Sequence, residues 1–290
     1  MCDDHDLETF RKEGISRRKF SVLVAGTGLG FAVAGCATAE DGAKAGLTES
    51  MITVDTADGT MDAFFVHPAR GASPAVIIWP DIAGLRDAFK IMARRLAGEG
   101  YAVLVANPYY RNVPAPQFAD FDEFRAEGGF QKVGPWRAAA NAEAIMRDTT
   151  SLIGYLDAQD AVDETRGVGA QGYCMGGPFT IWSAAGVPGR MRAAASFHGG
   201  GLVGDAETAP INLFDDINAN LLIAIAENDD AKAPDDKTKL RAAADAEGVD
   251  AEIEVYAADH GWTVYDSPAY NEDEGERAWA RLLALYKTSL

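Results

Sequence analysis

The sequence predicts an α/β fold in which a mostly parallel central sheet carries helices on both faces. Short apolar runs, such as residues 75–79 and 101–105, have the composition of strands buried on both sides, and segments with helical spacing separate them. A glycine-rich turn around Cys174 follows directly on another such run. We expect a single domain from residue 51 to residue 290, because no composition break and no internal repeat marks a second one.

The expected elements follow one another in a regular order. Residues 52–54 and 63–66 flank the turn residues Asp58 and Gly59 and predict a hairpin. Further strands are expected at 75–79, 101–105, 167–171, 193–197, 221–225 and 253–256, and helices at 88–99, 138–156, 178–185, 237–247 and 274–286. Residues 107–136 are rich in aromatic residues and prolines without steady periodicity, which predicts a loop or cap.

The chain is strongly acidic and poor in cysteine. Its 26 Lys and Arg against 44 Asp and Glu leave a formal net charge of -18. Such a charge repels nucleic acid and anionic lipid headgroups, so neither is an expected partner. Cys2, Cys36 and Cys174 lie far apart with no histidine beside them, so we expect no metal site. No cofactor is expected either. The oligomeric state is left open.

The N-terminal residues predict a bacterial export signal. The arginine pair at 17–18 precedes an apolar stretch, residues 21–34, which is too short and too rich in glycine to span a bilayer. The arginine pair is typical of the Tat route. We therefore expect a signal peptide over 1–39 and a short flexible tether over 40–50.

Two processing sites compete in this segment. Residues 33–36 resemble a lipobox, in which Cys36 would carry a lipid, whereas residues 37–39 form a small-x-small cleavage site. Either route places the mature protein in the periplasm or lipid-anchored at a membrane surface. Cys36 is thus the only expected membrane attachment.

The turn Gly172-Tyr173-Cys174-Met175-Gly176 has the form of a nucleophile elbow with cysteine in place of serine. Small neighbours allow the strained strand-to-helix turn, and the adjoining helix N-terminus favours a thiolate. The backbone N–H of Met175 is then expected to donate to an oxyanion. The alternative is a buried structural cysteine in a glycine-rich turn.

Two residues after later strands complete a candidate catalytic triad. Asp229 follows the strand at 221–225, and His260 follows the strand at 253–256. The chain order nucleophile, acid, histidine is that of the α/β-hydrolase fold. Cys174 would attack, His260 would transfer the proton and activate water, and Asp229 would orient the imidazole. Asp230 remains a rival for the acid, and we interpret His198, in a glycine turn after a strand, as structural.

From about residue 52 to residue 290 the chain resembles the dienelactone hydrolases of the α/β-hydrolase superfamily. The motifs that carry the resemblance are residues 79–86, 172–177, 196–200 and 256–262. The resemblance implies the triad Cys174, Asp229 and His260, with oxyanion N–H groups from Ile82 and Met175. It also implies that Asp81 stands where the family has an acidic residue, typically glutamate, that contacts the resting cysteine.

Substrate recognition is where the sequence departs from that family. The dienelactone enzyme holds a substrate carboxylate with two arginines; Arg111 matches one of them, and Val264 stands at the place of the other. Tyr110 and Trp262 are further candidates for the pocket lining, with core packing as the alternative. The expected activity is hydrolysis of a small ester or lactone through an acyl-thioester. The alternative is an exported binding lipoprotein with a catalytically silent hydrolase shell.

Overall fold

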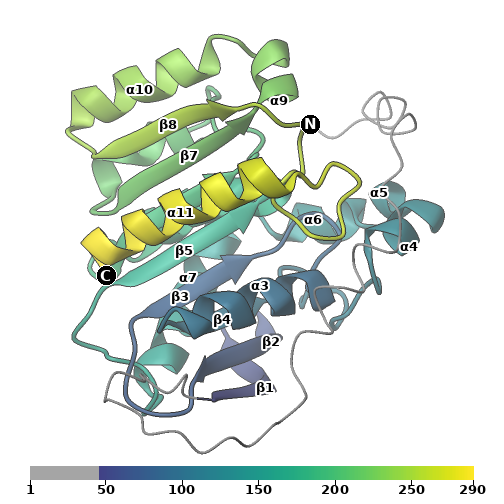
Figure 1. The fold of residues 1–290 in the computed structure, drawn as a ribbon, viewed down its shortest axis with the longest axis vertical. Coiled ribbons are helices and arrows are strands. Elements are labelled where there is room, and N and C mark those ends of the chain that lie inside the picture. Colours follow the sequence, from purple (N-terminus) through teal and green to yellow (C-terminus); the bar gives the residue numbers. More distant parts are fainter. Residues whose placement is uncertain (1–45) are drawn as a thin grey trace, which may run out of the picture. The chain divides into compact units, whose positions relative to one another are not determined.

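A single eight-stranded sheet organises residues 46–290, the part of the chain that this computed structural model describes (Figure 1). The expected signal peptide, Cys36 and the first part of the expected tether lie outside these residues. The strands are β1 (Leu47–Thr56), β2 (Gly59–Pro68), β3 (Ala75–Trp79), β4 (Ala102–Ala106), β5 (Val168–Tyr173), β6 (Met191–Phe197), β7 (Asn220–Ala226) and β8 (Ala251–Tyr256).

The strands are arranged in the order β1-β2-β4-β3-β5-β6-β7-β8. Strand β2 is antiparallel to β1 and β4, and all the pairings from β4 to β8 are parallel. Every residue of β3 and β4 is buried. This agrees with their unbroken apolar sequence, because a strand covered on both faces has no polar side. The prediction of a mostly parallel sheet is confirmed.

Strands β1 and β2 form the expected hairpin, but the hairpin is longer than predicted. Pairing runs from Thr56 opposite Gly59 to Leu47 opposite Pro68. The expectation of a tether over 40–50 is therefore wrong from Leu47 onward. The backbone pairing with β2 orders Leu47 to Ser50 although their side chains are exposed, so no hydrophobic pattern marks this part of the strand.

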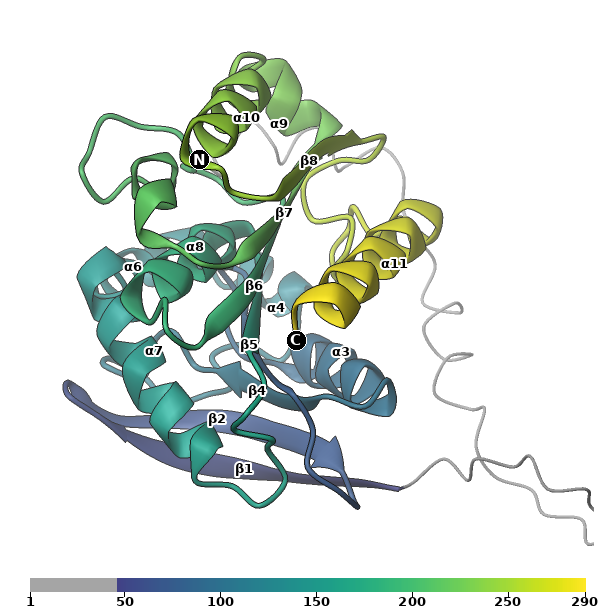
Figure 2. The ribbon, with the colours of Figure 1, turned by 90° about the vertical axis from the view of Figure 1, so that its left-hand side faces the viewer.

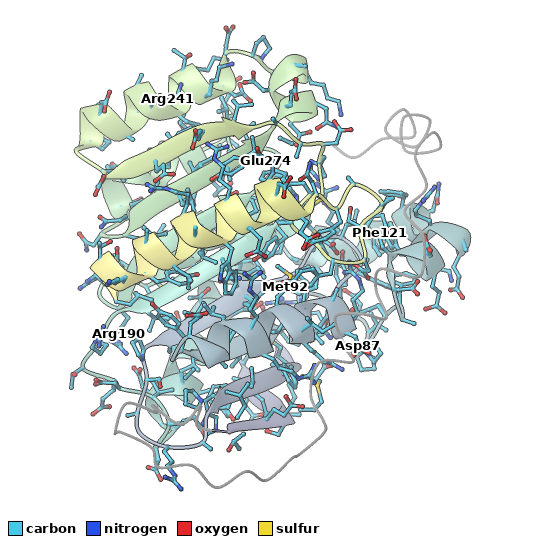
Figure 3. All side chains as sticks on the ribbon, in the orientation of Figure 1. Asp87, Met92, Phe121, Arg190, Arg241 and Glu274 are labelled. Atoms are coloured by element: carbon cyan, nitrogen blue, oxygen red, sulfur yellow. The ribbon has the colours of Figure 1, made fainter. Side chains whose placement is uncertain are left out.

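Helices cover both faces of the sheet (Figure 2). They are α3 (Asp87–Gly98), α4 (Phe121–Ala126), α5 (Gly129–Lys132), α6 (Gly134–Ala139), α7 (Ala142–Asp157), α8 (Gly177–Gly186), α9 (Glu227–Lys232), α10 (Asp236–Glu247) and α11 (Glu272–Ser289). Helices α3 and α11 lie on one face, and α7, α8 and α10 lie on the other. Met92 of α3 lies between α3 and α11, where both helices bury their apolar sides (Figure 3). No helix in residues 46–290 is long and apolar enough to cross a membrane.

The segment expected to be a loop or cap is a loop in its first half and helical in its second half. Helices α4, α5 and α6 follow one another from Phe121 onward, and the helix expected from residue 138 is interrupted and resumes only at Ala142. The Asn141 side chain accepts a hydrogen bond from the Ala144 N–H and so caps the new helix. The aromatic rings of the cap pack on one another, as Phe118 and Phe130 do on Phe124. Each of these helices is too short to carry an apolar stripe over several turns. Their sequence therefore shows no steady 3.6-residue hydrophobic period.

The carboxyl ends of the parallel strands meet at one edge of the sheet. The residues that follow them there are Asp81 and Ile82 after β3, Tyr109 after β4, Cys174 after β5, His198 after β6, Asp229 after β7 and His260 after β8. In open α/β sheets this edge is where ligands bind. The fold thus gathers residues that are up to 179 positions apart in the chain (81 to 260).

Candidate active site

Cys174 lies in a strained turn between β5 and α8. Its φ angle is 52°, a left-handed conformation that non-glycine residues rarely adopt. Both flanking glycines are required by close backbone approach. A Cβ atom on Gly172 would collide with the carbonyl oxygen of Gly176, and a Cβ atom on Gly176 would collide with that of Trp79. The turn therefore has the geometry of the nucleophile elbow that the glycine spacing predicts.

His260 and Asp229 are in direct contact. The Asp229 Oδ2 atom lies 2.5 Å from His260 Nδ1, and the His260 backbone N–H donates to the Asn228 side chain at 2.9 Å. Asp229 lies in the short helix α9 rather than in the expected loop. The neighbouring Asp230 carboxylate instead binds Lys237 Nζ at 2.5 Å. Of the two rival carboxylates, Asp229 is thus the one that can orient the imidazole.

His198 links the cysteine turn to the segment that follows His260. Its Nδ1 atom accepts the Cys174 backbone N–H at 3.1 Å, and its Nε2 atom lies 3.0 Å from Thr263 Oγ1. The His198 and His260 rings are 4.8 Å apart between centroids. Burial, and secondarily the charge of His260, lowers the pKa of His198 well below its ordinary value, so the ring is neutral.

The structural interpretation of His198 was therefore incomplete. Cys174 and His260 both lie beside the His198 ring, although the chain separates each of them from it by many residues. The available sequence signal was positional: His198 directly follows β6, at the sheet edge where Cys174 and His260 follow their own strands.

Ile82 and Met175, the two residues expected to bind an oxyanion, both contact the side chain of Tyr109. The Tyr109 hydroxyl donates a hydrogen bond to the Ile82 carbonyl at 2.8 Å and lies 3.2 Å from Met175 Sδ. Burial raises the pKa of Tyr109 well above its ordinary value, and the charges of Asp81 and Cys174 act in the same direction. The hydroxyl therefore stays protonated and can donate. Sequence reasoning missed Tyr109, although its place shortly after β4, at the same edge of the sheet, was an available signal.

Asp81 forms a buried ion pair with Arg86. The guanidinium donates to both carboxylate oxygens, at 2.7 and 2.9 Å, and the Ala83 backbone N–H adds a further bond at 2.9 Å. Burial raises the pKa of the Asp81 carboxyl, and Arg86 opposes that shift. We assign the pair as ionised because arginine keeps its charge and both oxygens accept from it. The expected contact of Asp81 with the Cys174 thiol stays a prediction.

Arg111 and Tyr110, the expected substrate contacts, are engaged within the protein. Arg111 binds the carboxylates of Asp58 and Asp148, each at 2.7 Å at its shortest. The Tyr110 hydroxyl donates to Asp148 at 2.7 Å and also meets Thr56 Oγ1. These bonds tie the β1–β2 turn to α7. They favour the alternative in which Arg111 pairs with nearby acids over a role in binding a substrate carboxylate.

Trp262 is part of the core. It is fully buried, stacks on Tyr256 and meets the His198 ring edge-on at 5.1 Å between centroids. Val264, which stands at the place of the family's second arginine, is also buried, with 1% of its surface exposed. Core packing, the alternative for Trp262, accounts for its position, and the Val264 position holds no cation for an anionic substrate.

A mostly parallel eight-stranded sheet, with a nucleophile elbow after a central strand and the candidate histidine after the last one, is the α/β-hydrolase fold. Within that fold, the chain belongs to the dienelactone hydrolase family, whose model matches residues 61–290. The protein is therefore a hydrolase enzyme.

Similar proteins support the same assignment. A Salmonella typhi protein named "Putative carboxymethylenebutenolidase" is 29% identical over 251 residues, which cover 84% of this chain and 87% of that protein. The carboxymethylenebutenolidase of Pseudomonas sp. (strain P51) is 25% identical over 244 residues, covering 83% of this chain and 95% of the other. A crystal structure titled "Putative Dienelactone Hydrolase" from Klebsiella pneumoniae superposes with a TM-score of 0.70 at 25% identity, over 83% of this chain and 99% of that one.

Proposed function

We propose that the protein hydrolyses a small ester or lactone with Cys174 as nucleophile, His260 as acid and base, and Asp229 as the residue that orients His260. The observation that carries the proposal is the contact of 2.5 Å between Asp229 Oδ2 and His260 Nδ1 at the sheet edge where the strained Cys174 turn lies. His198, which contacts both the turn and the His260 ring, supports the proximity of the two.

The proposed reaction has two steps. His260 takes the proton of the Cys174 thiol as the sulfur attacks the carbonyl carbon, and the backbone N–H groups of Met175 and Ile82 stabilise the developing oxyanion. The ester C–O bond breaks, the leaving alcohol takes a proton from protonated His260, and an acyl-thioester remains. Neutral His260 then removes a proton from water, which attacks the thioester and releases the acid and the thiol. Asp229 keeps the His260 proton on Nδ1, so that Nε2 serves both steps.

We further propose that neutral esters or lactones are better substrates than carboxylated ones. The names of the relatives denote a lactone that carries a carboxylate. In this chain, however, the Val264 position is apolar and buried, and Arg111 is already paired with Asp58 and Asp148. With a net charge of -18, the protein also lacks long-range attraction for an anion.

The test is hydrolysis by the purified full chain of a panel of neutral esters, neutral lactones and carboxylated lactones, with the variant Cys174→Ala. We expect Cys174→Ala to lose turnover of 4-nitrophenyl acetate, whereas the matched variant Cys36→Ala retains it. Wild-type turnover in Cys174→Ala would overturn the nucleophile. A wild type that hydrolyses no member of the panel would favour a silent binding protein, and a sharp preference for carboxylated lactones would overturn the substrate proposal.

We also propose export by the Tat route, on the sequence of residues 1–39 alone. Replacing both arginines at positions 17 and 18 by lysine is expected to retain the protein in the cytoplasm. Mass spectrometry of the mature N-terminus decides between the two processing sites. A lipid-modified Cys36 supports anchoring, and an unmodified chain that starts at Glu40 overturns it.

A further inference from the structure

We infer that His198 is a positioning residue that holds the Cys174 turn in register with the loop that carries His260. This inference rests on the proposed function, in which Cys174 and His260 act together. The His198 side chain is the bridge: one ring nitrogen binds the backbone of the nucleophile, and the other lies beside Thr263, three residues after His260.

The backbone at both ends of the first hydrogen bond is strained. Within residues 46–290, Cys174 and His198 are the two non-glycine residues with positive φ, at 52° and 41°. Such conformations persist only when the surrounding structure determines them strongly. The bond of 3.1 Å from the Cys174 N–H to His198 Nδ1 joins these two strained residues directly. The His198 backbone N–H, in turn, donates to the Ala224 carbonyl at 2.8 Å, which ties His198 to β7.

The hydrogen-bond pattern defines the tautomer of His198. Because the Cys174 N–H is a donor, Nδ1 accepts and carries no proton. A neutral ring then carries its proton on Nε2 and donates it to Thr263 Oγ1 at 3.0 Å. A protonated ring would have no acceptor for the Cys174 N–H. The buried, neutral state of His198 is therefore the state that the bridge requires.

The bridge also decides which backbone N–H group of the turn is available to bind an oxyanion. The Cys174 N–H is occupied by His198, so Met175 is left as the donor of the turn for an oxyanion. The centroid of the His198 ring lies 4.8 Å from that of the His260 ring and 5.1 Å from that of the Trp262 ring. Both of its nitrogens face protein partners, so His198 acts through Cys174 and His260 rather than on substrate.

The test compares two replacements of His198, one that keeps an acceptor for the Cys174 N–H and one that does not. In His198→Asn, the amide oxygen can take the place of Nδ1 as acceptor for the Cys174 N–H, and the bond to Thr263 is lost. In His198→Leu, the site remains filled but has no acceptor. Thr263→Val removes only the bond at Nε2, and His67→Leu is the matched control for loss of a histidine elsewhere on the fold.

Two readouts are measured on the full chain. The first is the rate of Cys174 alkylation by iodoacetamide at pH 7, located by peptide mass mapping, which does not depend on esterase activity. The second is kcat and KM for 4-nitrophenyl acetate. For His198→Leu we expect slower alkylation and a kcat lower by about 100-fold with little change in KM, because a displacement of about 1 Å at the reacting atoms has such an effect.

Rescue by His198→Asn is the decisive outcome. We expect His198→Asn to recover most of the lost alkylation rate and kcat, Thr263→Val to show a smaller loss, and His67→Leu to match wild type. Equal impairment in His198→Asn and His198→Leu would overturn the inference, since the ring would then only fill space. Wild-type rates in both would overturn it too. If His198→Leu does not fold, Thr263→Val is compared with wild type, and an unchanged alkylation rate and kcat in Thr263→Val would refute the bridge.

Failure of the proposed function has a different signature. A wild type without esterase activity refutes that function but leaves the alkylation comparison in place. Loss of alkylation in His198→Leu and its recovery in His198→Asn would then still support the bridge.

Discussion

Arg86 binds Asp81 through two parallel hydrogen bonds, 2.7 and 2.9 Å long, in a position where the arginine side chain has no solvent exposure. The same guanidinium binds Asp266 through two further bonds of 2.7 Å. Asp81 directly precedes Ile82, and Asp266 lies six residues after His260. Asp266 also accepts the backbone N–H of Phe121, the residue labelled at the start of α4 in Figure 3. Arg86 thus joins the turn that carries Asp81 and Ile82, the segment after His260 and the start of α4.

The first prediction concerns stability. Arg86→Met leaves two carboxylates without their partner, and a broken buried ion pair lowers the free energy of unfolding by about 3–5 kcal/mol. The matched control is Arg94→Met, since Arg94 pairs bidentately with Glu49 where both side chains are 40% exposed. That pair is screened by solvent, so its loss changes the free energy of unfolding by less than about 1 kcal/mol. Urea unfolding measures both free energies, and equal losses would contradict the stabilising role assigned to the buried ion pairs of Arg86 with Asp81 and Asp266.

The second prediction separates two adjacent tyrosines. Tyr109→Phe removes the bond to the Ile82 carbonyl, and we expect kcat for 4-nitrophenyl acetate to fall about tenfold, the equivalent of one hydrogen bond. Tyr110→Phe removes a hydroxyl that binds Asp148 and Thr56 and is expected to leave kcat within about twofold of wild type. Steady-state kinetics on both variants is the measurement. A larger effect in Tyr110→Phe would place the substrate beside Tyr110 instead.

The third prediction separates the two rival acids. Asp229→Asn replaces the carboxylate at His260 Nδ1 by an amide, which favours the wrong tautomer, and kcat is expected to fall by about 10³–10⁴-fold. Asp230→Asn affects a carboxylate that binds Lys237, so kcat should stay close to wild type. If Asp230→Asn carried the larger loss, the assignment of the orienting acid would be reversed.

The fourth prediction concerns Arg111. Arg111→Met leaves the buried Asp148 carboxylate without its cation, so the free energy of unfolding is expected to fall by about 3 kcal/mol. KM should change equally for neutral and carboxylated esters, because the guanidinium is already paired. Arg147→Met, which removes a more exposed arginine from Asp58, is the control for stability. A rise in KM limited to carboxylated esters would restore Arg111 as a substrate contact.

The fifth prediction concerns pH. Burial holds the pKa of His198 well below the ordinary value of 6.5, so below pH 6.5 the unfolded chain binds a proton at this position that the folded chain does not. Unfolding then takes up protons, and stability falls as pH decreases from 6.5 towards the lowered pKa, by about 1.4 kcal/mol per pH unit. Urea unfolding of wild type and His198→Asn from pH 5 to pH 8 isolates this contribution, because His260 is present in both. If the free energy of unfolding varied with pH in the same way in both proteins, the lowered pKa of His198 would be contradicted.

The local sequence was sufficient for much of the architecture. Fully buried strands such as β3 and β4 are unbroken apolar runs, and the elbow needs glycine at 172 and 176 because backbone atoms approach there. The order of Cys174, Asp229 and His260 behind successive strands was likewise visible, because parallel strands bring their carboxyl ends to one edge. These features depend on hydrophobicity and spacing within short segments, which a sequence displays directly.

The partner of each polar side chain was decided only by the tertiary structure. Arg86 meets Asp266 across 180 residues, Arg111 meets Asp148 rather than a free pocket, and His198 binds Cys174 from a neighbouring strand. The sequence shows a charged or polar residue at each of these places but not its distance to any other. Those distances follow from how separate strands and loops converge, so the ion pairs, the role of Tyr109 and the bridge at His198 became visible only in the folded chain.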